Sequence, residues 1–360
     1  MVKVKGVAAV VEDQMWAGRL HKPGDIRCER VPIPRPGPDE ALIRVKACGV
    51  CGSDHSRVMV NGTYSYPTTV GHEFAGEVVE VGPGVEGFLS GDRVTVVPLI
   101  PCGRCVYCKL GHYHLCDDYD YFGSRRDGAF AEYVVAPASN MIRIPDSVDW
   151  ETAAMTDPAS VALHAIRKGG VAVGQNVAVL GSGPIGLFAV QWARIAGANR
   201  VAAVDIVDRK IELARELGAD ITVNALQGDP VAALRAAVPD GFSCVVETAG
   251  SSITQQQAIH LACKGGTVVL CGISHDRLPL TDQSVDRLMR HEVGIVGSWN
   301  SSFSPDDSAN DWSTAVEFFG RGLLIGLPMV SHRYNLHQIK EAFEMASDRQ
   351  TYFNKIMFIP

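Results

Sequence analysis

The stretch Asn176-Val177-Ala178-Val179-Leu180-Gly181-Ser182-Gly183-Pro184-Ile185-Gly186 decides the fold of this chain. It opens with an apolar run of the kind found in buried parallel strands. A G-x-G-x-x-G motif then leaves this strand and opens a helix predicted over residues 184–196, which Gly197 ends. Asp205 follows Gly186 by nineteen residues, at the end of the next predicted strand. This order favours a dinucleotide-binding site over a tight turn without a ligand.

Each part of this motif has a role in the predicted cofactor site. Gly181, Gly183 and Gly186 let the backbone approach a pyrophosphate, which binds at the positively charged N-terminus of the helix. Asp205 is placed to accept hydrogen bonds from the adenosine ribose, and its charge repels a 2′-phosphate, so the sequence favours NAD over NADP. Lys210 lies either beside the ribose or on a solvated helix face.

Segments with different periodicities divide the chain. The first part, to about residue 150, alternates polar and apolar residues between Gly and Pro turns, and it predicts a barrel-like sheet. Its strands are expected at 41–47, 77–82, 92–97 and 130–135. After about residue 160, strands alternate with helices, which predicts an α/β fold with a doubly wound parallel sheet. These elements are strands at 176–180, 201–205, 244–247 and 267–271, and helices at 184–196, 209–217 and 255–263. The tail predicts helices at 312–319 and 339–345 and a strand at 355–359.

Composition and charge narrow the class of protein. Hydrophobic residues make up 46% and charged residues 20% of the 360 residues, as in globular proteins. The net charge of -7 argues against nucleic acid as a partner. No apolar run is long enough to span a membrane, and the N-terminus lacks the pattern of a secretion signal, so we expect a cytoplasmic protein.

Four cysteines crowd into residues 102–116 and give the strongest metal signal. Cys102, Cys105, Cys108 and Cys116 form a C-x2-C-x2-C-x7-C run that can wrap one zinc ion tetrahedrally. Because four thiolates close the coordination shell, this zinc should be structural. The alternatives are free buried thiols or an iron–sulfur cluster. The neighbouring His112 and His114 are expected to be solvated.

A second group is scattered along the chain and suits an open, catalytic zinc. Cys51, His72, Glu73 and Asp157 offer the S, N and O ligands that zinc accepts. Taken alone, a His beside a Glu on a loop is more often a solvated pair. A dinucleotide site in the same chain suggests a catalytic role for this zinc. Zinc lowers the pKa of a bound alcohol and so favours hydride transfer to nicotinamide.

Three residues that follow Cys51 extend this prediction. Ser53 is placed to pass the proton outward. Asp54 either orients a metal ligand or simply caps a helix. His55 is expected at the surface.

These motifs resemble those of the zinc-containing medium-chain dehydrogenases/reductases, over nearly the whole chain after about residue 15. The resemblance rests on Cys-Gly-Ser-Asp at 51–54, Gly-His-Glu at 71–73, Gly-Asp-Arg-Val at 91–94, the four cysteines and the glycine motif. It implies a GroES-like, β-rich catalytic domain with a Rossmann domain inserted before its last part. We therefore expect the catalytic domain over residues 1–160, the Rossmann domain over 161–302, and a return to the catalytic domain over 303–360.

Within this family the chain is most similar to the polyol dehydrogenases. These enzymes bind the catalytic zinc with a carboxylate, usually Glu, where this chain has Asp157 and other members have Cys. The shorter Asp side chain is expected either to shift the metal or to bring Glu73 into its coordination shell. Many relatives carry a relay histidine five positions after the first zinc cysteine, where this chain has Ser56. The resemblance also implies that a further set of residues lines the cofactor, namely Ile185, Gly272, Ile273 and Ser298.

The sequence therefore predicts an NAD-dependent enzyme with one catalytic and one structural zinc that oxidises a secondary hydroxyl of a polyol or polyol phosphate to a ketose. Arg125 and Arg126 are the candidates for a phosphate grip, unless nearby acids pair with them. The alternatives are an amino-alcohol or simple secondary-alcohol dehydrogenase, such as one acting on threonine, and a non-catalytic structural or redox-sensing protein. The family resemblance implies a homodimer or homotetramer.

Overall fold

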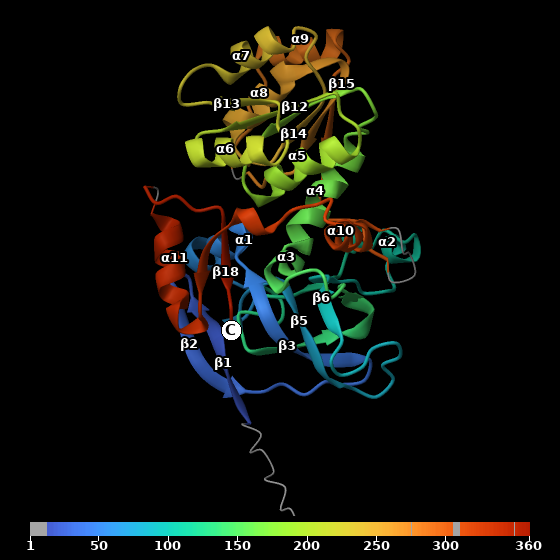
Figure 1. Ribbon diagram of the computed structural model, residues 1–360, viewed down its shortest axis with the longest axis vertical. Helices are drawn as coiled ribbons and strands as arrows, with labels where there is room; N and C mark the ends of the chain where they lie inside the picture. The colour runs from blue at the N-terminus through green and yellow to red at the C-terminus, as the bar shows by residue number, and fades with distance from the viewer. Residues whose placement is uncertain (1–12, 275, 305–309, 349) are drawn as a thin grey trace, which may run out of the picture.

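Two sheets of different construction divide the molecule (Figure 1). The computed structural model describes residues 13–274, 276–304, 310–348 and 350–360. The extension over residues 1–12 lies outside this described part. In the view of Figure 1 the parallel sheet and its helices form the upper half, and the β-rich domain forms the lower half.

The lower half is built on a seven-stranded sheet in the order β10-β6-β5-β3-β18-β17, with β9 also paired to β3. These strands are β3 (Glu40–Gly49), β5 (Glu73–Val81), β6 (Arg93–Val96), β9 (Tyr133–Pro137), β10 (Met141–Arg143), β17 (Val330–Tyr334) and β18 (Lys355–Phe358). Smaller sheets join β2 (Asp25–Pro32), β1 (Gln14–Lys22) and β4 (Thr68–Thr69), and β7 (Leu99–Ile100) with β8 (Asp120–Tyr121). Phe74, Phe130 and Phe358 lie in the buried core of this domain.

Short helices connect these strands and position the functional loops. They are α1 (Gly52–Ser56), α2 (Val106–Lys109), α3 (Trp150–Ala154) and α11 (Ile339–Ser347), the π-helix η1 (Arg57–Asn61), and the 3₁₀ turns η2 (Tyr113–Leu115), η3 (Ala138–Asn140), η4 (Leu327–Met329) and η5 (Leu336–Gln338). The last strand, β18, returns to the first domain, where Met357 faces Gly49 and Phe358 faces Cys48 of β3 in antiparallel register.

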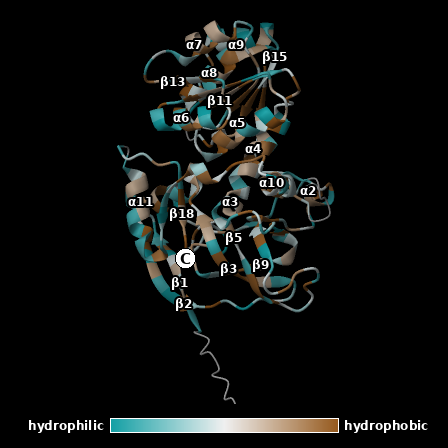
Figure 2. Ribbon diagram, in the orientation of Figure 1, coloured by the Kyte–Doolittle hydropathy of each residue, from teal (hydrophilic) through white to brown (hydrophobic). Residues whose placement is uncertain are grey.

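The upper half is a six-stranded, all-parallel sheet in the order β13-β12-β11-β14-β15-β16. Its strands are β11 (Asn176–Leu180), β12 (Arg200–Asp205), β13 (Ile221–Asn224), β14 (Phe242–Glu247), β15 (Ala262–Leu270) and β16 (Gly294–Gly297). Its helices are α5 (Pro184–Ile195), α6 (Asp208–Glu216), α7 (Pro230–Ala237), α8 (Ser252–Leu261) and α9 (Asp282–Arg290). The strands are hydrophobic along their length (Figure 2), as burial between two helical layers requires. The strand order reverses between β11 and β14, where open α/β sheets bind ligands.

The fold class predicted from the sequence is confirmed, including the doubly wound sheet. Two helices between the halves, α4 (Thr156–Lys168) and α10 (Asp311–Gly320), share one buried apolar cluster with both sheets. The helix expected to end at residue 263 ends at Leu261 instead, because the chain turns there into β15. The strand expected over residues 130–135 begins at Tyr133, since Phe130 is buried in an irregular segment against Phe358.

Candidate active site and cofactor site

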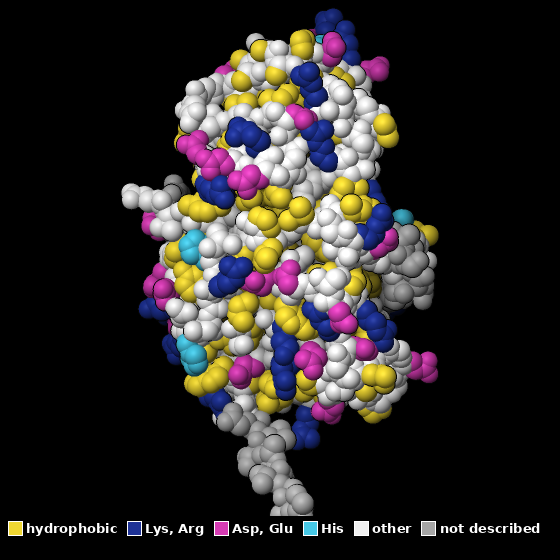
Figure 3. Space-filling model, viewed as in Figure 1, with side chains coloured by type: hydrophobic (Ala, Val, Ile, Leu, Met, Phe, Trp, Pro, Cys, Tyr) yellow, Lys and Arg dark blue, Asp and Glu magenta, His cyan; other side chains and the backbone are white. Residues whose placement is uncertain are grey.

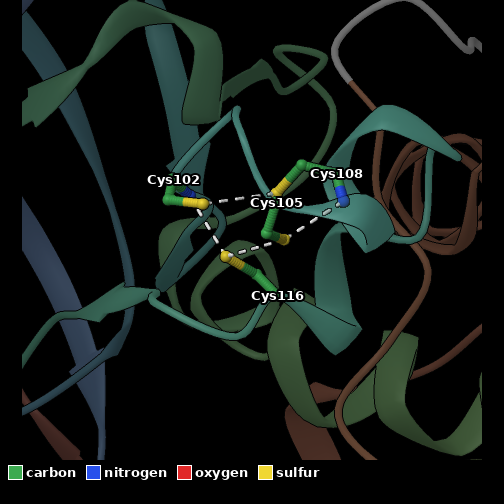
Figure 4. A group of neighbouring side chains, drawn as sticks. All are labelled: Cys102, Cys105, Cys108 and Cys116. Atoms are coloured by element: carbon green, nitrogen blue, oxygen red, sulfur yellow. Dashed lines mark hydrogen bonds between the residues drawn. The ribbon is translucent and has the colours of Figure 1, made fainter.

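The four clustered cysteines converge on one point in a loop beside α10 (Figure 4). One sulfur from each lies within 4.8 Å of the others. Backbone amides point at these sulfurs: Cys102 N donates to Cys116 Sγ at 3.2 Å, and Cys108 N donates to Cys105 Sγ at 3.4 Å. Such amide contacts lower the pKa of Cys105 to about 6. The loop therefore offers a closed thiolate cage, and zinc fits it.

The two histidines in this loop have different environments. His112 is exposed, as predicted. His114 was expected to be solvated, but this expectation is wrong: it is only 8% exposed and packs edge-on against His164 of α4, with ring centroids 5.0 Å apart. His164 Nδ1 in turn lies 3.0 Å from Asp311 Oδ2 at the start of α10. The cysteine loop is thus packed onto the helices that connect the two domains.

The second group of ligands meets where α1, β5 and α4 come together. Ligand atoms of Cys51, His72 and Glu73 all lie within 4.8 Å of one another. Asp54 organises them, because its Oδ2 accepts the Cys51 amide at 3.1 Å and its Oδ1 lies 3.0 Å from His72 Nδ1. Asp54 therefore both caps α1 and orients the imidazole, and the two roles weighed from the sequence coexist. With Nδ1 engaged, His72 keeps Nε2 for a metal.

Burial and neighbouring charges shift the pKa values of the ionisable groups in this site. Burial alone would lower the pKa of His72, but the Asp54 carboxylate raises it well above its ordinary value. Burial raises the pKa of Asp157 to about 7, and Glu73 adds to this shift while His72 opposes it. A bound dication would reverse the shift at Asp157 and keep the carboxylate ionised.

Asp157 lies in the first turn of α4 and faces the same site. It is 5% exposed, and its Oδ1 is buried with no hydrogen-bond partner in the described part of the chain. It does not belong to the tight group formed by Cys51, His72 and Glu73. A buried, unpartnered carboxylate oxygen is costly unless a ligand completes it, so Asp157 fits the role of an oxygen ligand to a metal.

Lys355 is a functional residue that the sequence did not point to. It is the first residue of β18, is 2% exposed, and pairs with Glu73 Oε2 while its Nζ also donates to the Val50 carbonyl at 3.1 Å. Burial would lower the pKa of Lys355, but the charge of Glu73 raises it. A lysine opening an otherwise apolar strand was the available signal. Lys355 thus competes with a metal for Glu73.

The donor set fits a catalytic zinc beside the structural one. The site offers the thiol of Cys51, the oriented imidazole of His72 and the carboxylates of Glu73 and Asp157. Among the described residues, Oδ1 of Asp157 has no hydrogen-bond partner. Cys51, His72 and a carboxylate would hold the ion and leave room for a substrate oxygen. The chain therefore carries one closed and one open zinc site.

The residues that follow Cys51 make hydrogen bonds either to neighbours of the metal ligands or to residues outside the site. Ser53 Oγ accepts a hydrogen bond from Arg57 at 3.0 Å. Ser56, which stands where a relay histidine is common, accepts from Asn61 at 2.8 Å and so belongs to its own helix turn. His55 was expected at the surface; it is partly exposed, and its Nε2 lies 3.0 Å from Ser347 Oγ, which connects α1 to α11.

The glycine motif forms the turn that the sequence predicted. Gly181 has φ +97°, which favours glycine, and a Cβ on Gly186 would run into the Gly181 carbonyl. Gly183 caps α5 and has open space where a side chain would stand, so a phosphate can approach the helix N-terminus. Asp205 Oδ2 accepts the Ser182 amide at 2.7 Å, and this bond holds the carboxylate against the loop.

The other cofactor residues expected from the sequence follow the carboxyl ends of neighbouring strands. Gly272 and Ile273 come after β15, and Ser298 comes after β16 with a buried hydroxyl that has no partner among the described residues. Ile185 stands in the first turn of α5. Lys210 lies on α6 with its Nζ 5.7 Å from the ring centroid of Phe353. These positions suit the edge of the sheet at which dinucleotides bind.

The two arginines proposed as a phosphate grip are engaged separately. Arg126 approaches Glu40 at 3.4 Å and Asp120 at 3.8 Å, so pairing with acids, the alternative left open by the sequence, is what the structure shows for it. Arg125 lies over the rings of Tyr64 and Tyr119, and its Nη1 donates to the Tyr119 carbonyl at 2.8 Å. The guanidinium groups therefore do not form one clamp.

Comparison with known proteins agrees with this geometry. Residues 37–146 match the family described as Alcohol dehydrogenase GroES-like domain, and residues 184–321 match Zinc-binding dehydrogenase. The galactitol 1-phosphate 5-dehydrogenase of Escherichia coli K12 is 35% identical over 89% of this chain and 93% of its own length. The sorbitol dehydrogenase of Bacillus subtilis is 33% identical over 97% of this chain and 98% of its own length.

Solved structures extend the likeness to the fold. A zinc-binding dehydrogenase from Sinorhizobium meliloti 1021, bound to NADP, has a TM-score of 0.89 at 34% identity and covers 97% of this chain and 100% of its own. The relatives include both polyol and threonine dehydrogenases. The two zinc sites, the dinucleotide motif and these similarities lead to one conclusion: the chain belongs to the zinc-containing medium-chain dehydrogenases/reductases, and it is a zinc-dependent NAD(P) alcohol dehydrogenase acting on a CH–OH group.

Proposed function

We propose that this enzyme oxidises a secondary hydroxyl of a sugar alcohol or its phosphate to a ketose, with NAD as the acceptor. The observation that carries the proposal is the Asp157 side chain, whose buried Oδ1 has no hydrogen-bond partner among the described residues and whose carboxylate interacts with His72 and Glu73. A carboxylate at this place is what the resemblance to polyol dehydrogenases implies. The names of the relatives from Escherichia coli and Bacillus subtilis support the same substrate class.

Each residue of the site has its own role in this proposal. Zinc, when bound, supplies a positive charge that stabilises the developing negative charge on the substrate oxygen. Cys51, His72 and Asp157 hold the ion, with Glu73 free to join them when it leaves Lys355. Asp54 fixes the imidazole of His72, and we assign the hydroxyl of Ser53, which accepts a hydrogen bond from Arg57, as the group that relays the proton outward. Burial of these groups strengthens each charge interaction.

We assign NAD as the cofactor from Asp205. Its Oδ1 is held by the amides of Ile206 at 2.8 Å and Val207 at 3.1 Å, so the carboxylate cannot swing away from a ribose bound beside it. The nearby Arg209 pairs with Glu212 and Glu216 on its own helix. Asp205→Ala should raise the KM for NAD and bring it closer to the KM for NADP. A parent enzyme that prefers NADP in steady-state kinetics would contradict the assignment.

The substrate class is tested with a panel of polyols, polyol phosphates, 2,3-butanediol and L-threonine, scored by NADH absorbance. We expect the highest kcat/KM among polyols. Higher kcat/KM for L-threonine or for the simple diol would refute the polyol proposal. Asp157→Asn should lower both turnover and the zinc content of the open site. Two zinc ions per chain with near-normal turnover would show that Asp157 is not a ligand.

We also propose that the enzyme is a homodimer or homotetramer that works in the cytoplasm without nucleic-acid or membrane partners. The strand β16 is one of the two edges of the parallel sheet; Ile295 on it is 37% exposed, and Trp299, which follows the strand, is 48% exposed. Such an apolar edge suits a second copy. On the face drawn in Figure 3, basic side chains are interspersed with acidic ones. In the described part of the chain, none of the helices is long and apolar enough to cross a membrane. Light scattering of Ile295→Lys should report a smaller particle than the parent.

A further inference from the structure

Arg57 stands beside the open metal site but belongs to none of the roles described so far. It begins η1, a π-helix, directly after α1, and helices of this type often occur at functional sites. Its Nη1 donates to Ser53 Oγ at 3.0 Å and to Asp54 Oδ1 at 3.2 Å. Because Asp54 also orients His72, the guanidinium is one side chain away from a metal ligand.

An aromatic ring lies between this guanidinium and the metal ligands. The Cζ of Arg57 is 5.9 Å from the ring centroid of Tyr121, and the ring of Tyr121 packs edge-on against His72 with centroids 5.4 Å apart. Burial raises the pKa of Tyr121 well above its ordinary value, and the charges of Asp157 and Cys51 add to this while Arg57 opposes them. Tyr121 therefore faces both the open site and Arg57. Its ring offers an apolar surface for a carbon chain that starts at the metal.

One edge of the Arg57 guanidinium is unused. Within the part of the chain that the structure describes, its Nε and Nη2 make no hydrogen bond, and the side chain is 22% exposed. Arg125 and Arg126 differ, because backbone and acidic groups already engage them. A free Nε/Nη2 edge matches the two oxygens of a carboxylate or phosphate and binds them through parallel hydrogen bonds.

We propose that Arg57 is a specificity-determining residue that binds an oxyanion, a phosphate or a carboxylate, carried on the same carbon chain as the oxidised hydroxyl. The proposal rests on the polyol function and deepens it. The Ser53 and Asp54 contacts hold Nη1, and so they fix the guanidinium in place and leave its Nε/Nη2 edge for a ligand. The competing role is purely positional: Arg57 would only support Asp54 and, through it, His72.

The test compares three substrates in matched variants. A neutral hexitol, its 1-phosphate and the corresponding hexonate are assayed with the parent, Arg57→Gln and Arg57→Lys. Arg57→Gln should lower kcat/KM for the preferred anion about 30- to 100-fold, chiefly through KM, because one or two charge-assisted hydrogen bonds are lost. The neutral hexitol should lose about tenfold less than the anion, because it makes no such bond and loses only the support that Arg57 gives to Asp54. Arg57→Lys should recover part of the loss, since it keeps the charge but not the fork.

Arg44→Gln is the matched control. Arg44 also lies over a tyrosine ring, 5.6 Å from the centroid of Tyr133, and it donates to that hydroxyl at 3.3 Å, but it belongs to β3 away from the metal ligands. This variant should keep the parent ratio of anionic to neutral substrate. The phosphate and carboxylate arms decide which oxyanion the site prefers, because the larger loss identifies it.

A binding measurement separates this proposal from the polyol proposal. Calorimetric titration of the hexitol 1-phosphate and the hexonate into the zinc-loaded enzyme with NADH needs no turnover. The preferred anion should bind the parent and Arg44→Gln alike and bind Arg57→Gln at least 30-fold more weakly. Equal losses for neutral and anionic polyols, or a parent that binds neither anion more tightly than the hexitol, would overturn the role of Arg57. A parent that oxidises none of the three substrates would refute the polyol function, whereas the titration would still decide whether Arg57 binds an oxyanion.

Discussion

The two metal centres of this protein are built in opposite ways. The closed centre takes four identical ligands from residues 102–116, and backbone amides serve its sulfurs. The open centre takes different ligands from α1, β5 and α4, and side chains from the same elements or from β18 orient them. In the closed centre, the ligands and the amides that support them thus come from one short segment of the chain. In the open centre, one carboxylate oxygen of Asp157 has no hydrogen-bond partner in the part of the chain that the structure describes.

This difference separates stability from chemistry. A site in which every ligand is satisfied holds its loop together and has no position for a substrate. A site with buried, incompletely satisfied groups costs folding free energy, and that cost is acceptable only where a bound ion or substrate relieves it. We therefore expect substitutions in the open centre to lower activity and substitutions in the closed centre to lower thermal stability.

The largest effect is expected in the open centre. Cys51→Ser or His72→Ala should lower kcat by at least about 1000-fold, because each removes a ligand of the ion that stabilises charge on the substrate oxygen. Thermal unfolding of Cys51→Ser should change less than that of a variant in the closed centre, and zinc analysis of either open-centre variant should fall from two ions per chain to one. A variant that keeps more than a tenth of the parent kcat would contradict the assignment.

A substitution in the closed centre should lower stability and leave catalysis nearly unchanged. Cys105→Ser should lower the midpoint of thermal unfolding by about 10 °C, because structural zinc contributes folding free energy directly. The kcat per folded molecule, measured well below that midpoint, should stay within about twofold of the parent. If Cys105→Ser is as stable as the parent and binds as much zinc, the loop does not hold a structural ion.

The same difference explains what the sequence could predict. The closed centre is local, so ligand type and spacing identify it without knowledge of the fold. The dinucleotide motif is local too, and Gly181 and Asp205 stand where the pattern places them. Lys355 and Tyr121 are different: they join the open centre only because β18 returns to β3 and because β8 carries a ring beside His72. No local pattern encodes those two contacts.

Burial was the other property that local pattern did not reveal. His114 stands in a polar loop, and its sequence neighbours are typical of a solvated segment, yet α4 covers it. The adjacent arginines Arg125 and Arg126 form one basic pair in the sequence, but their side chains reach different partners. Side-chain direction in an irregular loop depends on contacts with distant segments, and sequence spacing alone does not define it.

A smaller effect concerns the link between Glu73 and Lys355. Lys355→Met should destabilise the zinc-free enzyme by about 3 kcal/mol, because it leaves a buried carboxylate without its counter-charge. Zinc should recover much of this loss, since Glu73 can then turn to the ion. Denaturant unfolding with and without zinc measures both quantities. Lys340→Met is the control, because Lys340 is exposed and, among the described residues, forms an ion pair with Glu344 alone, at 3.7 Å. Equal losses with and without zinc would mean that Glu73 never reaches the metal.

The smallest effect tests whether the two centres are truly independent. His114 belongs to the closed centre's loop and packs on His164 of α4, the helix whose first turn carries Asp157. His114→Asn removes most of this ring contact while it keeps a small polar side chain, so we expect a loss of about 1 kcal/mol in unfolding free energy. If α4 is held mainly by the apolar core that it shares with both domains, kcat and the zinc affinity of the open centre should stay within about twofold of the parent. A larger fall in kcat at unchanged stability would show instead that the cysteine loop positions Asp157 through this histidine pair. The division between a stabilising centre and a catalytic centre would then be incomplete at α4.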